Sequence, residues 1–156
     1  MYLNISGQVT PVCSRSHISY RFAVLRPTAR LVVRFRYSPK ELDSRDRSRN
    51  LIDESLERYT LPGQLEAAKG NWEAYLPLKN LLTLSVDDPQ GHRGSAHRHD
   101  PQQLLHLAKA EASPGLEPGP IKPGMWAITV SLHAVVTETC DYELQVWGEE
   151  ADECAG

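Results

Sequence analysis

Apolar and polar residues alternate along two stretches in the last third of the chain. Between 126 and 132 every second residue is large and apolar, and after a polar break at 137–139 the alternation returns between 142 and 146. A period of two is typical of β-strands that bury one face. Because only a short polar break separates the two runs, we predict that they pair as an antiparallel hairpin. The expected inward residues are Trp126, Ile128, Val130, Leu132, Tyr142, Leu144 and Val146.

Further alternating runs predict strands at 3–9, 17–25, 31–37, 78–87 and 103–110. In the first of these, the spacing of apolar residues stretches at Gly7, which we interpret as a β-bulge. The run at 103–110 has good helix propensity by itself, but the strands around it favour a strand. The segment 87–91 has turn composition, and the polar stretch that follows it is predicted to be a loop.

One segment follows a different period. Residues 47–59 place apolar side chains at near-helical spacing among many charges, which predicts a short surface helix ending before Pro62. Its apolar stripe, expected to cover one open end of the sheets, consists of Leu51, Ile52, Leu56 and Tyr59.

These segments together predict an all-β fold, an antiparallel two-sheet β-sandwich of jelly-roll type with one helical insertion. Phe35 and Leu84 join the inward residues of the last two runs in the expected core. The sandwich is expected to form one domain over residues 1–148, followed by an acidic tail at 149–156.

Charge and composition narrow the class of protein. The 156 residues include 17 Lys and Arg against 20 Asp and Glu, a net charge of −3, so no nucleic-acid binding is expected. No apolar run approaches the roughly 20 residues that cross a bilayer, and the first residues lack a signal-peptide pattern. We therefore expect a cytoplasmic protein without a membrane partner. The three cysteines, without CxxC spacing, predict neither a disulfide framework nor a zinc site.

A set of motifs in order along the chain resembles a known accessory domain. It is similar to the N-terminal β-sandwich of carbaryl-hydrolase-type (CehA/McbA-like) metallohydrolases of the polymerase-and-histidinol-phosphatase (PHP) superfamily. Its closing part is also similar to bacterial pre-peptidase C-terminal domains. The matching segments are LTLSVDDPQGHRG at 82–94, ASPG at 112–115, GPIKPGMW at 119–126 and YELQV at 142–146.

The metal-binding motif of that hydrolase family, His-x-His with a downstream Ser-Asp-Gly, has no match after the closing strand. The His97-Arg98-His99 sequence lies upstream of that strand, and Pro101 follows where the family pattern would continue. The resemblance therefore implies the accessory fold and not the hydrolase. A protein partner, a PHP-type hydrolase or a second copy is the expected interaction.

The densest candidate chemistry lies in the polar stretch after the predicted turn. On an extended segment His97 and His99 point to the same side, so both could reach one ion, although a closed site needs two more ligands. The alternative to a metal site is that these histidines lie on a solvated loop. We therefore expect no metal and no cofactor. Arg93, between two glycines, either clamps an anionic ligand or pairs with Asp87 or Asp88 to fix the loop. The candidate ligand-binding residues are Asp88, His92, Arg93, His97, Arg98 and His99.

Aromatic residues outside the alternation offer a second possibility. Trp147 is expected on the outward face, where an exposed ring could stack on a sugar, so a carbohydrate or anion module is an alternative function. No GxSxG, P-loop, GxGxxG or HExxH motif is present. Cys140 and His133 could pair as nucleophile and base, but the charge of Asp141 would raise the thiol pKa and oppose this. A non-catalytic interaction module is therefore favoured over a metal-dependent hydrolase.

Overall fold

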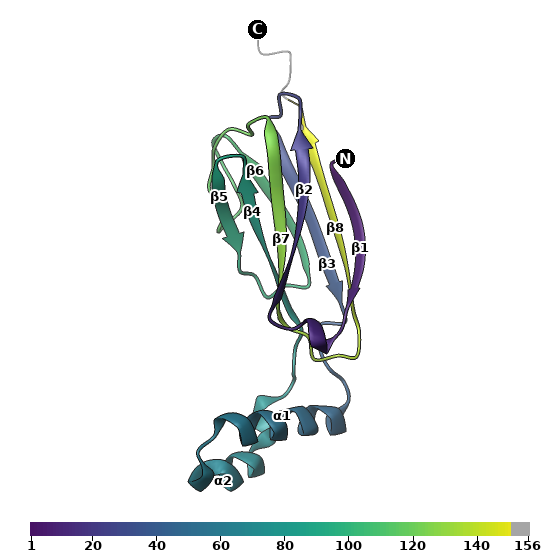
Figure 1. Ribbon diagram of the computed structural model, residues 1–156, viewed down its shortest axis with the longest axis vertical. Helices are drawn as coiled ribbons and strands as arrows, with labels where there is room; N and C mark the ends of the chain where they lie inside the picture. Colours follow the sequence, from purple (N-terminus) through teal and green to yellow (C-terminus); the bar gives the residue numbers. More distant parts are fainter. Residues whose placement is uncertain (151–156) are drawn as a thin grey trace.

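The computed structural model describes residues 1–150 of the chain. Within this range, eight strands form two four-stranded antiparallel sheets that face each other (Figure 1). One sheet has the order β1-β8-β3-β6 and the other β2-β7-β4-β5, which confirms the predicted all-β two-sheet sandwich. The strands are β1 (Leu3–Val9), β2 (Ser16–Val24), β3 (Arg30–Ser38), β4 (Leu81–Asp88), β5 (Gly91–Ala96), β6 (Gln102–Ala108), β7 (Gly124–Ala134) and β8 (Cys140–Glu149).

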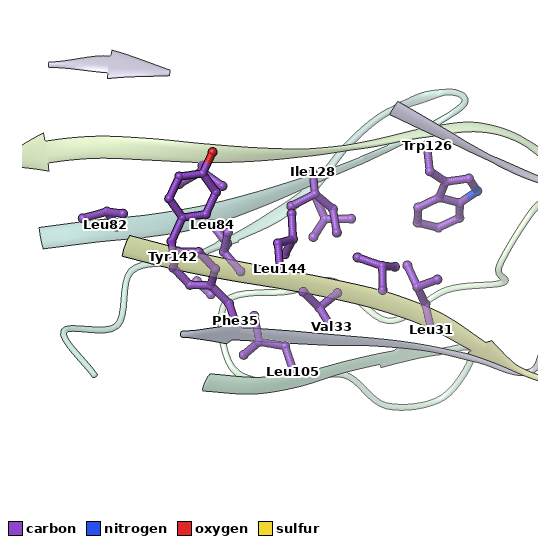
Figure 2. Close-up of a cluster of buried hydrophobic side chains, with 14 of the residues drawn as sticks. Leu31, Val33, Phe35, Leu82, Leu84, Leu105, Trp126, Ile128, Tyr142 and Leu144 are labelled. Carbon is purple, nitrogen blue, oxygen red and sulfur yellow. The ribbon is translucent and has the colours of Figure 1, made fainter. Parts of the chain in front are cut away.

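The core lies between the two sheets and is filled by the inward face of each alternating run. Figure 2 shows Trp126 and Ile128 facing Leu144 and Leu31 across this interior. Phe35, Leu84, Ile128 and Leu144 are each at most 1% exposed. The predicted burial of the alternating residues is confirmed, and so is the strand assignment of β6 against its helix propensity.

The predicted hairpin between 126–132 and 142–146 is wrong. β7 pairs with β2 and β4, whereas β8 pairs with β1 and β3, so the two runs face each other from opposite sheets. Period-two alternation identifies a buried face but not the neighbouring strand, and both inner faces of a sandwich show it. The five residues 135–139 therefore cross the end of the sandwich instead of making a tight turn.

Asn80 holds this crossing in place. Its Oδ1 accepts from the Val136 backbone N–H at 2.7 Å, and its Nδ2 donates to Pro39 O at 2.9 Å and Thr137 Oγ1 at 2.8 Å. Asn80 is fully buried, so these partners compensate for the loss of water around its amide.

Two smaller predictions also fail. The polar stretch after the turn contains β5, an edge strand that pairs with β4 although it has neither β-branched nor aromatic residues. Gly7 is not at a bulge, since β1 and β8 pair in unbroken register. The glycine instead makes room for the Tyr142 ring, because a Cβ at this position would overlap that ring.

The helical insertion between β3 and β4 stands off one end of the sandwich (Figure 1). The predicted helix is confirmed with a start two residues earlier, where Ser44 Oγ accepts from the Arg47 N–H at 3.2 Å and caps the first turn. Trp72 is buried beneath the guanidinium groups of Arg45 and Arg49, at 4.7 and 5.4 Å from its ring centre. The helical elements within residues 1–150 are α1 (Arg45–Tyr59) and α2 (Leu65–Gly70), with the short 3₁₀ turns η1 (Pro11–Cys13), η2 (Pro62–Gln64) and η3 (Trp72–Tyr75).

β8 includes Glu149, where the acidic tail was predicted to begin, and residues 151–156 of that tail lie outside the described residues.

Candidate functional site

Arg93 is the most completely bonded of the residues singled out from the sequence. It lies on β5, and its side chain is only 8% exposed. Its Nε and Nη2 donate to Glu117 O at 3.2 and 3.0 Å, and Nη2 also donates to Gly119 O at 3.0 Å. Its Nη1 donates to Pro120 O at 3.1 Å and to Asp88 Oδ2 at 3.2 Å. These bonds use the five N–H donors of a guanidinium, so the group acts as a clamp on the 117–120 loop.

Trp126 and Gly119 leave space for the Arg93 side chain. Its guanidinium lies 5.4 Å from the Trp126 ring centre, and a Cβ on Gly119 would come within 2.9 Å of Nη2. Burial by itself would raise the pKa of Asp88, but hydrogen bonds from the Gln90 backbone and from Arg93 lower it below its ordinary value. The geometry thus includes the expected pairing with Asp88, but the loop that Arg93 fixes is 117–120, which the sequence did not predict, and Arg93 has no donor left over for an anion.

The structure does not gather the histidines of this region. His92 is the second residue of β5 and contacts Asp87 Oδ1 at 3.3 Å, whereas His97 and His99 follow the other end of the strand. His92 and His97 are five positions apart along this extended segment, which corresponds to about 16 Å, so their side chains do not lie close together. Arg98 contributes its backbone oxygen to Gln103 Nε2 at 3.4 Å. Among residues 1–150, no three His, Cys, Asp or Glu side chains are close enough together to hold a metal ion.

Cys140 and His133 are not arranged as a nucleophile and base. His133 is exposed and its Nε2 lies 2.8 Å from Thr83 Oγ1, while Cys140 is fully buried. Burial raises the pKa of the Cys140 thiol, and the charge of Asp141 raises it further, so the thiolate is disfavoured.

An apolar groove opens where the helical insertion meets the end of the sandwich. It encloses a cavity of about 300 Å³. One wall is the apolar stripe of α1, and the other combines η1, the crossing at 135–136 and the segment that returns to β4. Leu51, Ile52 and Leu56 of the stripe therefore lie at one open end of the sheets, as expected, whereas Tyr59 does not line the groove. The lining residues are Pro11, Leu51, Ile52, Ser55, Leu56, Tyr75, Leu78, Val135 and Val136.

The groove is bordered by exposed apolar side chains and by two arginines. Val12 on η1 is 89% exposed, and Tyr59 at the end of α1 is 65% exposed. Arg47 Nε donates to Val136 O at 3.3 Å, and Arg15 Nη2 donates to the Tyr59 hydroxyl at 3.4 Å. The groove could not be predicted from the sequence, because its two walls come from segments more than 80 residues apart, at Leu51 and Val135.

A second hollow, of about 500 Å³, lies on the outer face of the β1-β8-β3-β6 sheet. Trp147 borders it, on the outward face where the alternation of β8 placed this residue. Arg34, Arg36, Gln102 and Leu104 complete its side-chain lining.

Comparison with known proteins does not assign the chain to a family. No family model matches it, and no curated protein matches it. Among solved structures, the crystal structure of GEBA250068378 from Sulfurospirillum deleyianum aligns over 93% of this chain and 98% of that chain, with 8% identity and a TM-score of 0.33. Within the described residues, no helix has the length and apolar character needed to cross a membrane.

Proposed function

We propose that the protein is a non-catalytic β-sandwich module that binds a partner protein through the apolar groove between α1 and the end of the sandwich. The observation that carries this proposal is the groove itself, whose lining is almost entirely apolar. A folded chain gains by covering such a surface, because each Å² of apolar area removed from water contributes about 25 cal/mol.

The charges beside the groove suggest the chemistry of the occupant. Arg47 lies at the Val136 side and Arg15 at the Tyr59 side, so the groove is flanked by positive charge. An amphipathic segment with an apolar face and acidic residues at its ends complements both features. The resemblance to the accessory domain of PHP-type hydrolases supplies a class of partner, and a surface segment of such a hydrolase is the occupant we expect.

Two synthetic peptides test the groove directly. Both carry leucines at helical spacing, and one has glutamates at its ends where the other has lysines. We expect the acidic peptide to shift the NMR methyl signals of Leu51, Leu56, Leu78 and Val135, with the basic peptide binding more weakly. If neither peptide shifts these signals, the groove is not a docking site.

A matched pair of substitutions locates the binding. Leu56→Arg places a charge in the groove and is expected to abolish peptide binding, whereas Leu25→Arg changes a leucine that is already 81% exposed and does not line the groove. Both variants are first checked for wild-type thermal unfolding. Equal binding by the two variants would contradict the proposed site.

The partner class needs a separate measurement. The purified catalytic domain of a carbaryl-hydrolase-type enzyme is titrated with the full chain in a calorimeter, with Leu56→Arg as the control. Binding by the wild type alone supports the hydrolase as partner, and absence of binding contradicts it. A concentration-dependent dimer that Leu56→Arg dissociates would instead identify a second copy as the occupant and overturn the separate-partner proposal.

A further inference from the structure

The hollow on the outer face of the β1-β8-β3-β6 sheet has a defined arrangement of side chains. In the ladder, Arg34 lies opposite Gln145 on one side and Leu104 on the other. In the next outward row Arg36 lies between Glu143 and Gln102. The hollow therefore spans neighbouring positions on β8, β3 and the edge strand β6, and rigid strands position its side chains better than loops would.

The two arginines of this hollow differ in their partners. Arg36 Nε donates to Glu143 Oε2 at 2.6 Å, so its charge is balanced within the sheet. Arg34 makes no ion pair and no side-chain hydrogen bond with any residue between 1 and 150. The hollow consequently holds one uncompensated positive charge with donors free to grip a carboxylate at two points.

Apolar surface lies beside this charge. Leu104 is 63% exposed although it stands in the middle of a strand, and Trp147 borders the same hollow. A flat ring can pack against such a surface, while the amide of the exposed Gln102 can both donate to and accept from hydroxyl groups. The Arg34 guanidinium, the apolar surface of Leu104 and Trp147, and the Gln102 amide together complement a polyhydroxylated ring that carries a carboxylate.

We propose that this face binds acidic carbohydrate, with the carboxylate of a uronate residue on Arg34 and the sugar ring against Trp147 and Leu104. This site is separate from the protein-binding groove, because none of its lining residues belongs to the groove. Glu143 holds Arg36 away from the carboxylate and leaves Arg34 as the anchor.

The test uses a short oligogalacturonate and its carboxyl-reduced, neutral counterpart, each titrated into the full chain by calorimetry and by NMR. We expect the acidic oligosaccharide to bind and the neutral one to bind at least about tenfold more weakly, since a charged hydrogen bond contributes about 1.5–3 kcal/mol. Binding should also weaken with added salt. Equal affinity for both sugars would overturn the proposal, as would absence of oligogalacturonate binding at millimolar concentration.

Substitutions tie the binding to this face. Arg34→Ala is expected to weaken oligogalacturonate binding about tenfold. Arg21→Ala is the matched control, because Arg21 is an exposed arginine on a strand of the other sheet. Trp147→Ala should weaken binding as well, and Trp147→Phe, which keeps an aromatic ring, should restore much of it. If Arg21→Ala weakens binding as much as Arg34→Ala, the attraction is general and the site is overturned.

Two further probes separate the possible sources of binding. Sodium sulfate tests whether any anion suffices, and benzoate tests whether any ring with a carboxylate suffices. We expect both to compete poorly with oligogalacturonate. Full competition by either one at equal concentration would overturn the assignment to a sugar.

Discussion

At the scale of single residues, Arg93 joins β5, the 117–120 loop and Asp88 through one guanidinium. Lysine has the same charge but lacks the planar fork, so it cannot meet these acceptors together. We expect Arg93→Lys to lower the free energy of unfolding by about 2–4 kcal/mol, measured by denaturant titration. Arg21→Lys, at an exposed position, should leave it nearly unchanged. An unaltered transition in Arg93→Lys would contradict the clamp.

Asp88 gives this cluster a pH dependence. Its pKa is held below the ordinary value in the folded chain, so its contribution to stability is complete above the unfolded pKa of about 3.9 and is lost as the pH falls through the folded pKa. Asp88→Asn should therefore be less stable than the wild type at neutral pH. The difference between the two should shrink below about pH 4, as followed by denaturant titrations across the acid range. A difference that stays constant down to acid pH would show that ionisation of Asp88 is not involved.

Gly7 shows a different kind of constraint, one of space. A Cβ added at Gly7 would overlap the ring of Tyr142, and the hydroxyl of that ring is hydrogen-bonded to the Tyr20 hydroxyl. We expect Gly7→Ala to cost about 1–3 kcal/mol in unfolding free energy, because the ring must move. Gly63→Ala, which would meet nothing within 4 Å, is the control for a glycine with free space around it. If the two substitutions cost the same, the close approach of Tyr142 is not what requires glycine.

At the scale of elements, the crossing between β7 and β8 depends on Asn80. Asn80→Ala would leave the Val136 N–H, the Pro39 carbonyl and the Thr137 hydroxyl without this partner, and we expect a loss of about 2–3 kcal/mol. Hydrogen exchange should accelerate at 135–139 more than in the β3-β8 ladder. Asn50→Ala on the exposed side of α1 is the control. Uniform acceleration across both regions would indicate a general loss of stability.

The elements also show what the sequence determines and what it leaves open. The alternation in β3, β4, β7 and β8 predicts the buried faces correctly, because burial acts on each side chain locally. The pairing of β7 and β8 was not predictable in this way, since two facing sheets and one hairpin bury the same residues. β5 was missed because its partner strand and Arg93 stabilise it, and its own composition does not.

The same distinction applies to the candidate sites. The sequence singled out Arg93 and its pairing with Asp88, although not the 117–120 loop that Arg93 holds, and it placed Trp147 on the outward face. It could not assemble the groove, whose walls meet only when α1 lies against the crossing and η1. It also could not show that Arg34 is unbalanced, because that depends on Glu143 being paired with Arg36.

At the scale of the whole molecule, the sandwich and the helical insertion are largely separate in their packing. The buried apolar residues of the insertion, Ile52 and Trp72, do not belong to the continuous core between the sheets. The chain leaves and re-enters the sandwich at neighbouring points. There the backbones of Glu41 and Lys79 pair as an isolated antiparallel β-bridge, and the Leu42 N–H donates to Leu78 O at 2.9 Å. The insertion is thus a long connection between β3 and β4 whose two ends lie side by side, and the sandwich core is complete without it.

This arrangement allows the two proposed sites to be separated in one experiment. Replacing residues 42–78 with a short Asn-Gly turn connects Glu41 to Lys79, which already lie opposite each other as an antiparallel pair. We expect the sandwich to unfold cooperatively because the replaced segment contributes no residue to its core. The shortened chain should lose the acidic-peptide binding that needs α1 and keep the oligogalacturonate binding on the β1-β8-β3-β6 face. Calorimetry with both ligands, after circular dichroism has confirmed a cooperative melt, gives the result. A folded variant that still binds the peptide would remove the groove as its site, and one that loses the sugar as well would show that the outer face depends on the insertion.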